Sequence, residues 1–235
     1  MISIDNLPTD EGMEERTAVL MITCKRYKQV WMPFWTLFNK YWPDCPYRVA
    51  MGTDFDQYDG IETIEIGRDL GWSDNCIYLL NQLTEDRVIL FFEDFLPIDT
   101  FNTDRIRRLV RHSFDYNIGC LRLAPCPGPT APWPYTSSLG ILQPHDAYRL
   151  SLQTALWDRR LLLQLLKSGE NGWDTEIKGT ARASKRPEHF VSVWRGESPI
   201  PYYITAVVKG TWEDGAIELL KKEGVSLDKI TKRIA

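Results

Sequence analysis

Two adjacent carboxylates, Glu93 and Asp94, directly follow an unbroken apolar run at residues 88–92. A short apolar run closed by polar residues and a proline is typical of a strand buried on both faces. Open α/β sheets bind ligands at the carboxyl ends of such strands. Carboxylates are preferred ligands of hard divalent cations, which can in turn carry nucleotide phosphates. The pair predicts either a metal–phosphate site or, with equal weight, the solvated start of a loop.

Other polar side chains follow predicted strands or begin a helix beside them. Residues 23–26 end the first strand, Asp54 follows the second, and residues 72–75 begin a helix with a strong N-cap signal. Right-handed crossovers between parallel strands bring these positions to one edge of a sheet. There Asp54 or Asp74 would meet the base or ribose of a nucleotide, and Lys25 or Arg26 its phosphates. For each residue alone, capping or surface solvation is an equally good interpretation.

A second acidic cluster, Asp174 and Glu176, follows a predicted helix and a glycine-containing turn. Either carboxylate would serve as a general base for a sugar hydroxyl. The alternative, which spacing alone favours, is an acid pair that stabilises a helix N-terminus. The chain also has nine tryptophans and ten tyrosines, several in polar contexts. Aromatic faces suit the apolar C–H face of a sugar ring, whereas core packing and interfaces are the alternatives.

The first half of the chain alternates predicted strands and helices, which is typical of an open, mostly parallel sheet. The strands are 17–23, 47–52, 61–66, 88–92 and 118–123, and the helices are 30–41, 76–83 and 103–114. The second half begins with a proline-rich loop at 124–134. It continues with a hairpin from 140–142 and 148–153, a helix at 158–168, strands at 189–194 and 202–208, a helix at 215–223 and a short basic helix. The change near residue 124 predicts two lobes of one domain.

Composition excludes several classes of protein. The 235 residues carry a net charge of −4, which argues against nucleic-acid binding. Five dispersed cysteines without a CxxC motif indicate reduced thiols, and the acidic first 16 residues indicate a cytosolic protein without a leader. No apolar run approaches the roughly 20 residues of a membrane span. Phosphate-binding glycine loops, GxSxG and HExxH are missing, and three histidines argue against a zinc hydrolase.

Six short motifs in order carry a resemblance to a known family. They are Thr-Cys-Lys-Arg-Tyr at 23–27, Gly-Trp-Ser-Asp-Asn at 71–75, Phe-Glu-Asp-Phe at 92–95, Leu-Gln-Thr-Ala-Leu-Trp at 152–157, Trp-Asp-Thr-Glu at 173–176 and Lys-Gly-Thr-Trp at 209–212. Together they resemble bacterial GT-A-type glycosyltransferases of surface-polysaccharide or lipopolysaccharide gene clusters. The resemblance extends over about residues 17–222.

The resemblance implies a GT-A-like α/β fold: a Rossmann-like, mixed but mostly parallel sheet flanked by helices, in a single domain with an acceptor-side lobe. Residues 1–16 would be an acidic N-terminal lead-in. Residues 17–123 would bind the nucleotide-sugar, and residues 124–235 would form the acceptor-side half and C-terminal helices. The implied reaction moves a sugar to a saccharide or lipid-linked glycan hydroxyl. It would take place in the cytoplasm. The C-terminal lysines would either contact the inner face of the membrane or, in the interpretation that we prefer, lie on a solvated helix face.

The resemblance also assigns residues to roles. The family's Asp-x-Asp motif falls at 93–95, where Glu93 replaces the first Asp and Phe95 the second. The resemblance therefore leaves two alternatives: Asp94 and Glu93 hold Mg²⁺ or Mn²⁺, or the site works without a metal. Glu176, in preference to Asp174, falls at the position of the catalytic base. The expected nucleotide-sugar-binding residues are Thr23, Arg26, Asp54, Trp72, Asp74, Asn75, Glu93, Asp94 and Lys209, and the expected acceptor-binding residues are Trp133, Tyr135 and Trp173.

Two other functions remain open at this point. A nucleotidyltransferase would make the activated sugar, but such enzymes usually carry a Gly-rich basic loop that residues 24–27 lack. A non-catalytic glycan-binding protein on a decayed transferase fold would explain the altered acidic motif.

Overall fold

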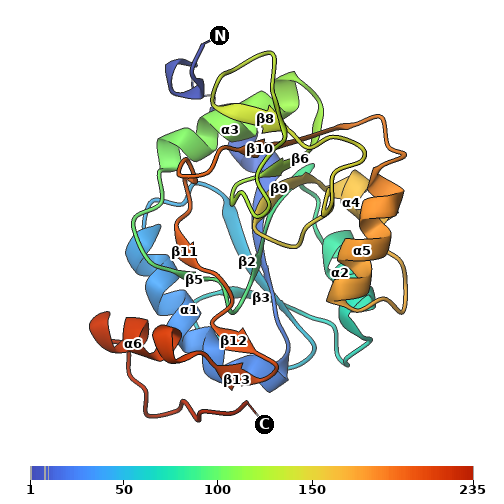
Figure 1. The fold of residues 1–235 in the computed structure, drawn as a ribbon. Coiled ribbons are helices and arrows are strands. Elements are labelled where there is room, and N and C mark those ends of the chain that lie inside the picture. The colour runs from blue at the N-terminus through green and yellow to red at the C-terminus, as the bar shows by residue number, and fades with distance from the viewer. Residues whose placement is uncertain (1, 8, 10, 235) are drawn as a thin grey trace.

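A nine-stranded sheet runs through the centre of the molecule (Figure 1). The computed structural model describes residues 2–7, 9 and 11–234. The strand order is β3 (Glu62–Glu65), β2 (Arg48–Thr53), β1 (Thr17–Ile22), β4 (Arg87–Phe92), β9 (Ala155–Asp158), β6 (Ile118–Arg122), β10 (His189–Val193), β8 (Leu139–Ile141) and β7 (Ala131–Pro132). The pairings make all of these strands run in one direction except β8 and β9. The expected α/β fold with a mixed, mostly parallel sheet is confirmed.

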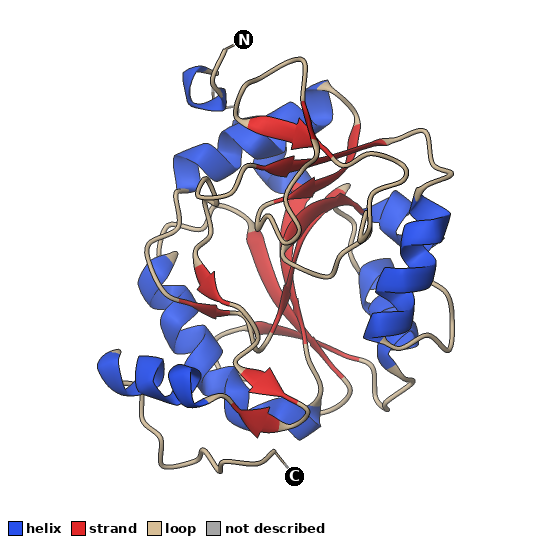
Figure 2. Cartoon of the chain, viewed as in Figure 1, coloured by secondary structure: helices blue, strands red, loops and turns tan. Residues whose placement is uncertain are grey.

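Helices cover both faces of this sheet (Figure 2). One face carries α1 (Lys28–Tyr41), α3 (Thr103–Asp115) and α6 (Asp214–Lys222), which pack an aromatic-rich core against the strands. The other face carries α2 (Trp72–Gln82), α4 (Arg159–Leu165) and α5 (Gly172–Ala183) around a smaller core. All six residues of β1 are buried, which explains why its sequence is apolar without alternation. No helix in the described part of the chain is both long and apolar enough to cross a membrane.

Two short ribbons stand at the carboxyl edge of the sheet and frame the site described below. One pairs β5 (Leu96–Pro97) with β11 (Tyr202–Tyr203), and the other pairs β12 (Val207–Val208) with β13 (Thr211–Trp212). The sequence predicts a single strand over residues 202–208, which is wrong. Thr205, with a φ of +61°, interrupts it, because a β-branched residue in the left-handed region cannot continue a strand.

The predicted hairpin between 140–142 and 148–153 is also wrong. β8 pairs with β10 and β7 instead. Residues 148–150 make other contacts: the buried Arg122 guanidinium donates to the Tyr148 carbonyl at 2.6 Å, and the Thr180 hydroxyl exchanges hydrogen bonds with the Leu150 backbone. These contacts use backbone amide and carbonyl groups that would otherwise form the hydrogen bonds of the predicted hairpin.

Two further segments differ from the prediction. Residues 155–158, which end at the first residue of the predicted helix at 158–168, form β9 between β4 and β6, since the short apolar run at 155–157 does not distinguish a strand from a helix start. The predicted closing basic helix does not form among residues 224–234. That segment instead lies along the β12–β13 ribbon, where the Trp212 amide donates to the Lys232 carbonyl at 3.1 Å and Ile234 is buried.

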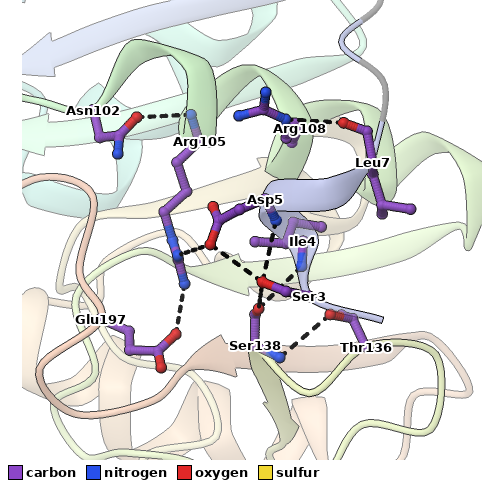
Figure 3. Close-up of polar contacts among 10 residues, drawn as sticks. All are labelled: Ser3, Ile4, Asp5, Leu7, Asn102, Arg105, Arg108, Thr136, Ser138 and Glu197. Carbon is purple, nitrogen blue, oxygen red and sulfur yellow. Dashed lines mark hydrogen bonds and ion pairs between the residues drawn. The ribbon is translucent and has the colours of Figure 1, made fainter. Parts of the chain in front are cut away.

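The acidic lead-in docks in part on α3 (Figure 3). Ile4 is fully buried, and its amide donates to the Ser138 hydroxyl at 3.0 Å. The Arg105 guanidinium bridges Asp5 at 2.7 Å and Glu197 at 2.6 Å. This apolar anchor with its ion pairs fixes residues 3–7, whereas residues 1, 8 and 10 of the lead-in lie outside the described part.

Candidate active site

A cavity of about 320 Å³ opens at the carboxyl ends of β1 and β4, beside the N-terminus of α2. Five of the predicted nucleotide-site residues line it, namely Thr23, Trp72, Asn75, Glu93 and Asp94. They share the cavity wall with Ile22, Cys24, Tyr27, Asp69, Phe92 and Val207. The convergence of strand ends at one edge of the sheet therefore exists for these residues.

The acid pair at the end of β4 consists of the buried Glu93 and the half-buried Asp94, and none of the described basic residues forms an ion pair with it. Burial raises the pKa of Glu93, and the neighbouring charge of Asp94 raises it further. Burial likewise raises the pKa of Asp94. Among the described residues no lysine or arginine forms an ion pair with either carboxylate, and none lines this cavity. A bound cation would favour the charged forms of both carboxylates, which burial and their mutual repulsion otherwise disfavour.

The remaining polar groups of this cavity, cavity 1, fix its walls. The Asn75 side chain accepts a hydrogen bond from the Leu70 amide at 2.9 Å and donates to Asp69 at 2.9 Å, which orders the turn before α2. The Thr23 hydroxyl accepts from the Trp31 indole N–H at 2.8 Å. Burial and the charge of Glu93 raise the pKa of the Cys24 thiol to about 11. Cys24 is therefore a neutral thiol at neutral pH and not a thiolate nucleophile.

Four predicted nucleotide-site residues lie outside the cavity wall. Asp54 accepts from the Lys25 amide at 2.6 Å and orders the turn that carries Cys24. Asp74 accepts from the Gly169 amide at 2.9 Å and joins α2 to the turn before α5. Arg26 is exposed on the short helix at Lys25–Tyr27, and Lys209 is exposed in the β12–β13 turn. The Asp54 and Asp74 carboxylates each accept a hydrogen bond from a backbone amide in these positions.

A second cavity, cavity 2, of about 370 Å³ adjoins the first. Its lining residues are Phe95, Leu152, Gln153, Asn171, Gly172, Trp173, Glu176 and Thr205. The Trp72 ring of cavity 1 lies 3.6 Å from the position that a Cβ atom on Gly172 would take, and Phe95 follows Asp94 directly. The linings of the two cavities therefore come close together at Trp72 and the N-terminus of α5.

Glu176 and Asp174 have different surroundings. Glu176 lines cavity 2, where one carboxylate oxygen accepts from the Leu152 amide at 2.8 Å. Asp174 pairs with Lys178 at 3.2 Å on the outside of α5. Trp173 is 71% exposed at the mouth of the same cavity. A carboxylate beside an exposed indole is a suitable arrangement for binding a sugar ring and its hydroxyl groups.

The other two predicted acceptor residues line neither cavity 1 nor cavity 2. The Trp133 indole is 1% exposed and donates to Nε2 of His112 at 2.9 Å. Tyr135 is exposed, but its ring packs 4.2 Å from that of Tyr116 at the end of α3. The Trp133 ring also contacts His189, the first residue of β10. These rings form an aromatic cluster away from both cavities, because the proline-rich loop carries them back onto α3.

Several lining residues were not identified from the sequence. Asp69 carries a signal, since an Asp two residues before a Gly is typical of the turn that its side chain closes here. No sequence pattern marks the other three polar lining residues, Gln153, Asn171 and Thr205. They lie in loops whose positions depend on distant contacts. The Gln153 side chain, for example, is held by the Tyr202 hydroxyl at 2.8 Å.

A divalent cation fits the acid pair only in company with a ligand. No group of three or more His, Cys, Asp or Glu side chains able to hold a metal exists within the described ranges. Mg²⁺ commonly binds through one or two carboxylates together with substrate phosphates and water. Glu93 and Asp94 provide such a pair. Without a cation, their charges and that of Asp69 would repel a diphosphate placed in the same cavity.

Neither protein-family models nor curated proteins match this sequence. Solved structures do. TarS of S. aureus, residues 1–349, matches with a TM-score of 0.54 at 13% identity over 80% of this chain and 59% of that one, and its complex with UDP matches with a TM-score of 0.55. The mannosyltransferase PcManGT of Pyrobaculum calidifontis, in complex with GDP-Man and Mn²⁺, matches with a TM-score of 0.50 at 13% identity over 87% of this chain and 61% of that one.

The chain thus spans about three fifths of the length of the chains that it matches. At 13% identity the likeness concerns the fold. The sheet, its flanking helices and these neighbours together show that the chain has a GT-A-like fold.

Proposed function

We propose that this protein is a glycosyltransferase that moves a sugar from a nucleotide-sugar to a saccharide hydroxyl. The observation that carries the proposal is the pair of neighbouring cavities, one with an acid pair to which no described basic residue forms an ion pair and one with the Glu176 carboxylate. The fold neighbours support it, because one was solved with UDP and another with GDP-Man and Mn²⁺. The finer expectation, a bacterial cytoplasmic enzyme of surface-polysaccharide biosynthesis, rests on the motif order alone.

In this proposal the donor diphosphate lies in cavity 1 next to Glu93 and Asp94. A Mg²⁺ or Mn²⁺ ion held by these carboxylates and the diphosphate would offset the charge that develops on the leaving group. Asn75 and Asp69 keep the turn before α2 in place, and the Trp72 ring, stacked on Phe92 at 5.9 Å, separates the donor from the core. The exposed Arg26 and Lys209 would stabilise the phosphates from outside the cavity wall.

The acceptor saccharide lies in cavity 2 against Trp173. Glu176 removes the proton from the attacking hydroxyl as its oxygen forms a bond with the anomeric carbon. The bond between that carbon and the diphosphate oxygen breaks, and the nucleoside diphosphate leaves with the electron pair. The Leu152 amide donates to one Glu176 oxygen and leaves the other for the acceptor.

A thermal-shift screen of UDP-, GDP-, CMP- and dTDP-sugars, each with and without Mn²⁺, tests the donor site. A ligand at a hundred times its Kd stabilises the folded state by about 2.7 kcal/mol, so one nucleotide class should raise the Tm by several degrees. Asp94→Asn should abolish the Mn²⁺-dependent part. Asp59→Asn, at an exposed position after β2, is the matched control and should retain it.

The rival functions give different results. A folded protein that shows no shift with any nucleotide-sugar but binds oligosaccharides is a glycan-binding protein, and our proposal is then wrong. Formation of a nucleotide-sugar from a nucleoside triphosphate and a sugar phosphate would instead identify a nucleotidyltransferase.

A further inference from the structure

A short irregular segment, residues 151–154, contributes two residues to the wall of cavity 2 and is fixed by side chains from two other elements. The Leu152 amide donates to the Glu176 carboxylate at 2.8 Å. The last amide of the segment donates to the Tyr202 hydroxyl at 3.3 Å. Gln153 lies between these two contacts, so its backbone is held in place, and its side chain lines the same cavity as Glu176.

The Gln153 side chain is held at one end of its amide group. Its carbonyl oxygen, Oε1, accepts a hydrogen bond from the Tyr202 hydroxyl at 2.8 Å. Because the amide group is planar, this contact directs the nitrogen atom, Nε2, away from Tyr202. Nε2 has no hydrogen-bond partner among the described residues, and it is not one of their enclosed atoms. Its two N–H groups are therefore available to a ligand in cavity 2.

Tyr202 can orient this amide because Tyr202 is itself fixed. It is 8% exposed, and it belongs to β11, where it pairs with Pro97 of β5. Its ring stacks on that of Phe95 with 5.0 Å between the centroids. Its hydroxyl accepts from the Thr154 amide and donates its single proton to Gln153. The Tyr202 hydroxyl thus determines which end of the Gln153 amide faces the cavity.

Cavity 2 therefore contains a hydrogen-bond acceptor and a hydrogen-bond donor that suit one sugar ring. The second carboxylate oxygen of Glu176 can accept from a hydroxyl, and Nε2 of Gln153 can donate to the oxygen of another hydroxyl. Glu176 contacts the backbone of the residue next to Gln153, so a single ring can reach both groups. The exposed Trp173 indole offers a face to the same ring.

We infer that Gln153 selects the acceptor: its side-chain NH₂ donates to a second hydroxyl of the ring whose reacting hydroxyl faces Glu176, and Tyr202 is the positioning residue. This inference rests on the proposed function for the identity of cavity 2 as the acceptor site. It narrows the acceptor from any saccharide hydroxyl to a ring with a second free hydroxyl at one fixed position. A deoxy or protonated amino substituent at that position leaves the N–H groups of Gln153 without a partner.

Trp173 provides a readout at the mouth of cavity 2. The full chain is labelled with fluorotryptophan, and Trp173→Phe identifies the Trp173 resonance in the fluorine NMR spectrum. Methyl glycosides of glucose, galactose, mannose and N-acetylglucosamine are titrated up to their solubility limits, followed by the monodeoxy derivatives of the one that binds most tightly. At one ring position, loss of the hydroxyl should raise the Kd about 3- to 10-fold, as expected for one hydrogen bond.

Gln153→Met removes the donor but nearly keeps the length of the side chain. The Kd of the parent glycoside should rise by the same factor, and loss of the selected hydroxyl should then have no further effect, because both changes remove one hydrogen bond. Loss of any other hydroxyl should have the same effect as in the wild type. Gln164→Met, at an exposed position of α4 outside the walls of cavities 1 and 2, is the matched control and should keep the wild-type pattern.

Tyr202→Phe keeps the ring stacked on Phe95 but leaves the Gln153 amide free to rotate. The preference for the selected hydroxyl should shrink, whereas the Kd of the derivative that lacks this hydroxyl should stay the same. If this variant does not fold, because the Thr154 amide has lost its acceptor, the comparison with Gln153→Met decides alone. A Gln153→Met variant that weakens every derivative by the same factor, or a Trp173 resonance that no glycoside perturbs, overturns the inference.

The titrations need no nucleotide-sugar, so they separate this inference from the proposed function. Coupling between Gln153 and one hydroxyl, without a thermal shift by any nucleotide-sugar, assigns the residue to a glycan-binding protein and removes the transferase. A thermal shift by a nucleotide-sugar without this coupling keeps the transferase and rejects the role of Gln153.

Discussion

Glu176 and Asp174 lie two positions apart, and the difference between their contacts decides which of them can act on a ligand. Asp174 has its carboxylate on the solvent side of α5 with Lys178, whereas Glu176 turns its carboxylate into cavity 2. Within the described residues only one Glu176 oxygen accepts a hydrogen bond, from the Leu152 amide. This backbone group orients the Glu176 carboxylate toward the proposed acceptor.

Replacing Glu176 by Gln tests its role as the base. The Gln carbonyl can still accept from the Leu152 amide, so the fold and the nucleotide-sugar shift should be retained. Loss of a general base typically costs about 10²–10⁴-fold in rate, and kcat should fall by that amount. Glu218→Gln, on the exposed face of α6, is the control and should keep wild-type kcat. An equal loss in Asp174→Asn, with Glu176→Gln active, would reverse the assignment.

A buried histidine makes stability depend on pH. His112 is 1% exposed, its Nε2 accepts from the Trp133 indole, and its Nδ1 has no hydrogen-bond partner among the described residues. Burial lowers its pKa to about 4, and the charge of Asp115 opposes this only in part. Between pH 6.5 and 4 the unfolded chain therefore binds a proton that the folded protein excludes. Stability is present above the unfolded pKa and is lost as pH falls through this range.

His112→Gln should flatten the acid side of the stability curve. Urea unfolding at pH 7 and pH 4.5 should show that the wild type loses more stability than the variant, by up to about 3 kcal/mol, since one pKa unit corresponds to about 1.4 kcal/mol. The carboxylates titrate in both proteins, so the difference between them isolates His112. If the free energy of unfolding of both proteins falls equally between pH 7 and pH 4.5, protonation of His112 does not destabilise the folded state and the prediction is wrong.

Helix α5 is positioned by polar contacts at its start and along one side. Asn171 caps it by accepting from the Asp174 amide at 2.9 Å, and the turn before it is bonded to Ser73 and Asp74 at the start of α2. Along its side, Glu176 and Thr180, one turn apart, hold the backbone of residues 150–152. The wall of cavity 2 is thus a helix joined to an irregular segment by two side chains.

Thr180→Val tests the contact between α5 and the backbone of residues 150–152. Valine has nearly the shape of threonine but leaves the Leu150 amide and carbonyl without the hydroxyl that they share at 3.1 and 3.2 Å. The loss should cost about 1–3 kcal/mol in the free energy of unfolding. Because this contact shapes the wall of cavity 2, the KM for the acceptor should rise, whereas the Tm shift caused by the nucleotide-sugar should stay the same. Thr180→Ser restores the hydroxyl and should recover both values; failure to do so would assign the effect to packing.

Across the whole molecule, the sequence predicts best where local pattern and burial coincide. The apolar runs of β1, β4 and β6 and the acids after β4 could be recognised because each is a contiguous segment with one environment. Cavity 2 could not, since Gln153 and Thr205 are brought in by Tyr202 and by the bond from the Ala206 amide to the Asp94 carbonyl. Trp133 was misjudged because a polar, proline-rich context does not reveal that the indole is buried against His112. Contacts between distant loops have no local signature.

The position of β9 between β4 and β6 has a consequence for the folding of the chain during its synthesis on the ribosome. Strands β1 to β4 emerge first and can pair with one another, but β6 has no neighbour until β9 and then β10 are made. During that interval β4 and β6 expose unpaired edges, the kind of surface on which nascent chains aggregate. Most of the wall around the acid pair thus exists before α5 and Glu176 have been synthesised. Both cavities are completed only after the sheet has closed, because Thr205 of cavity 2 and Val207 of cavity 1 follow β10 in the sequence.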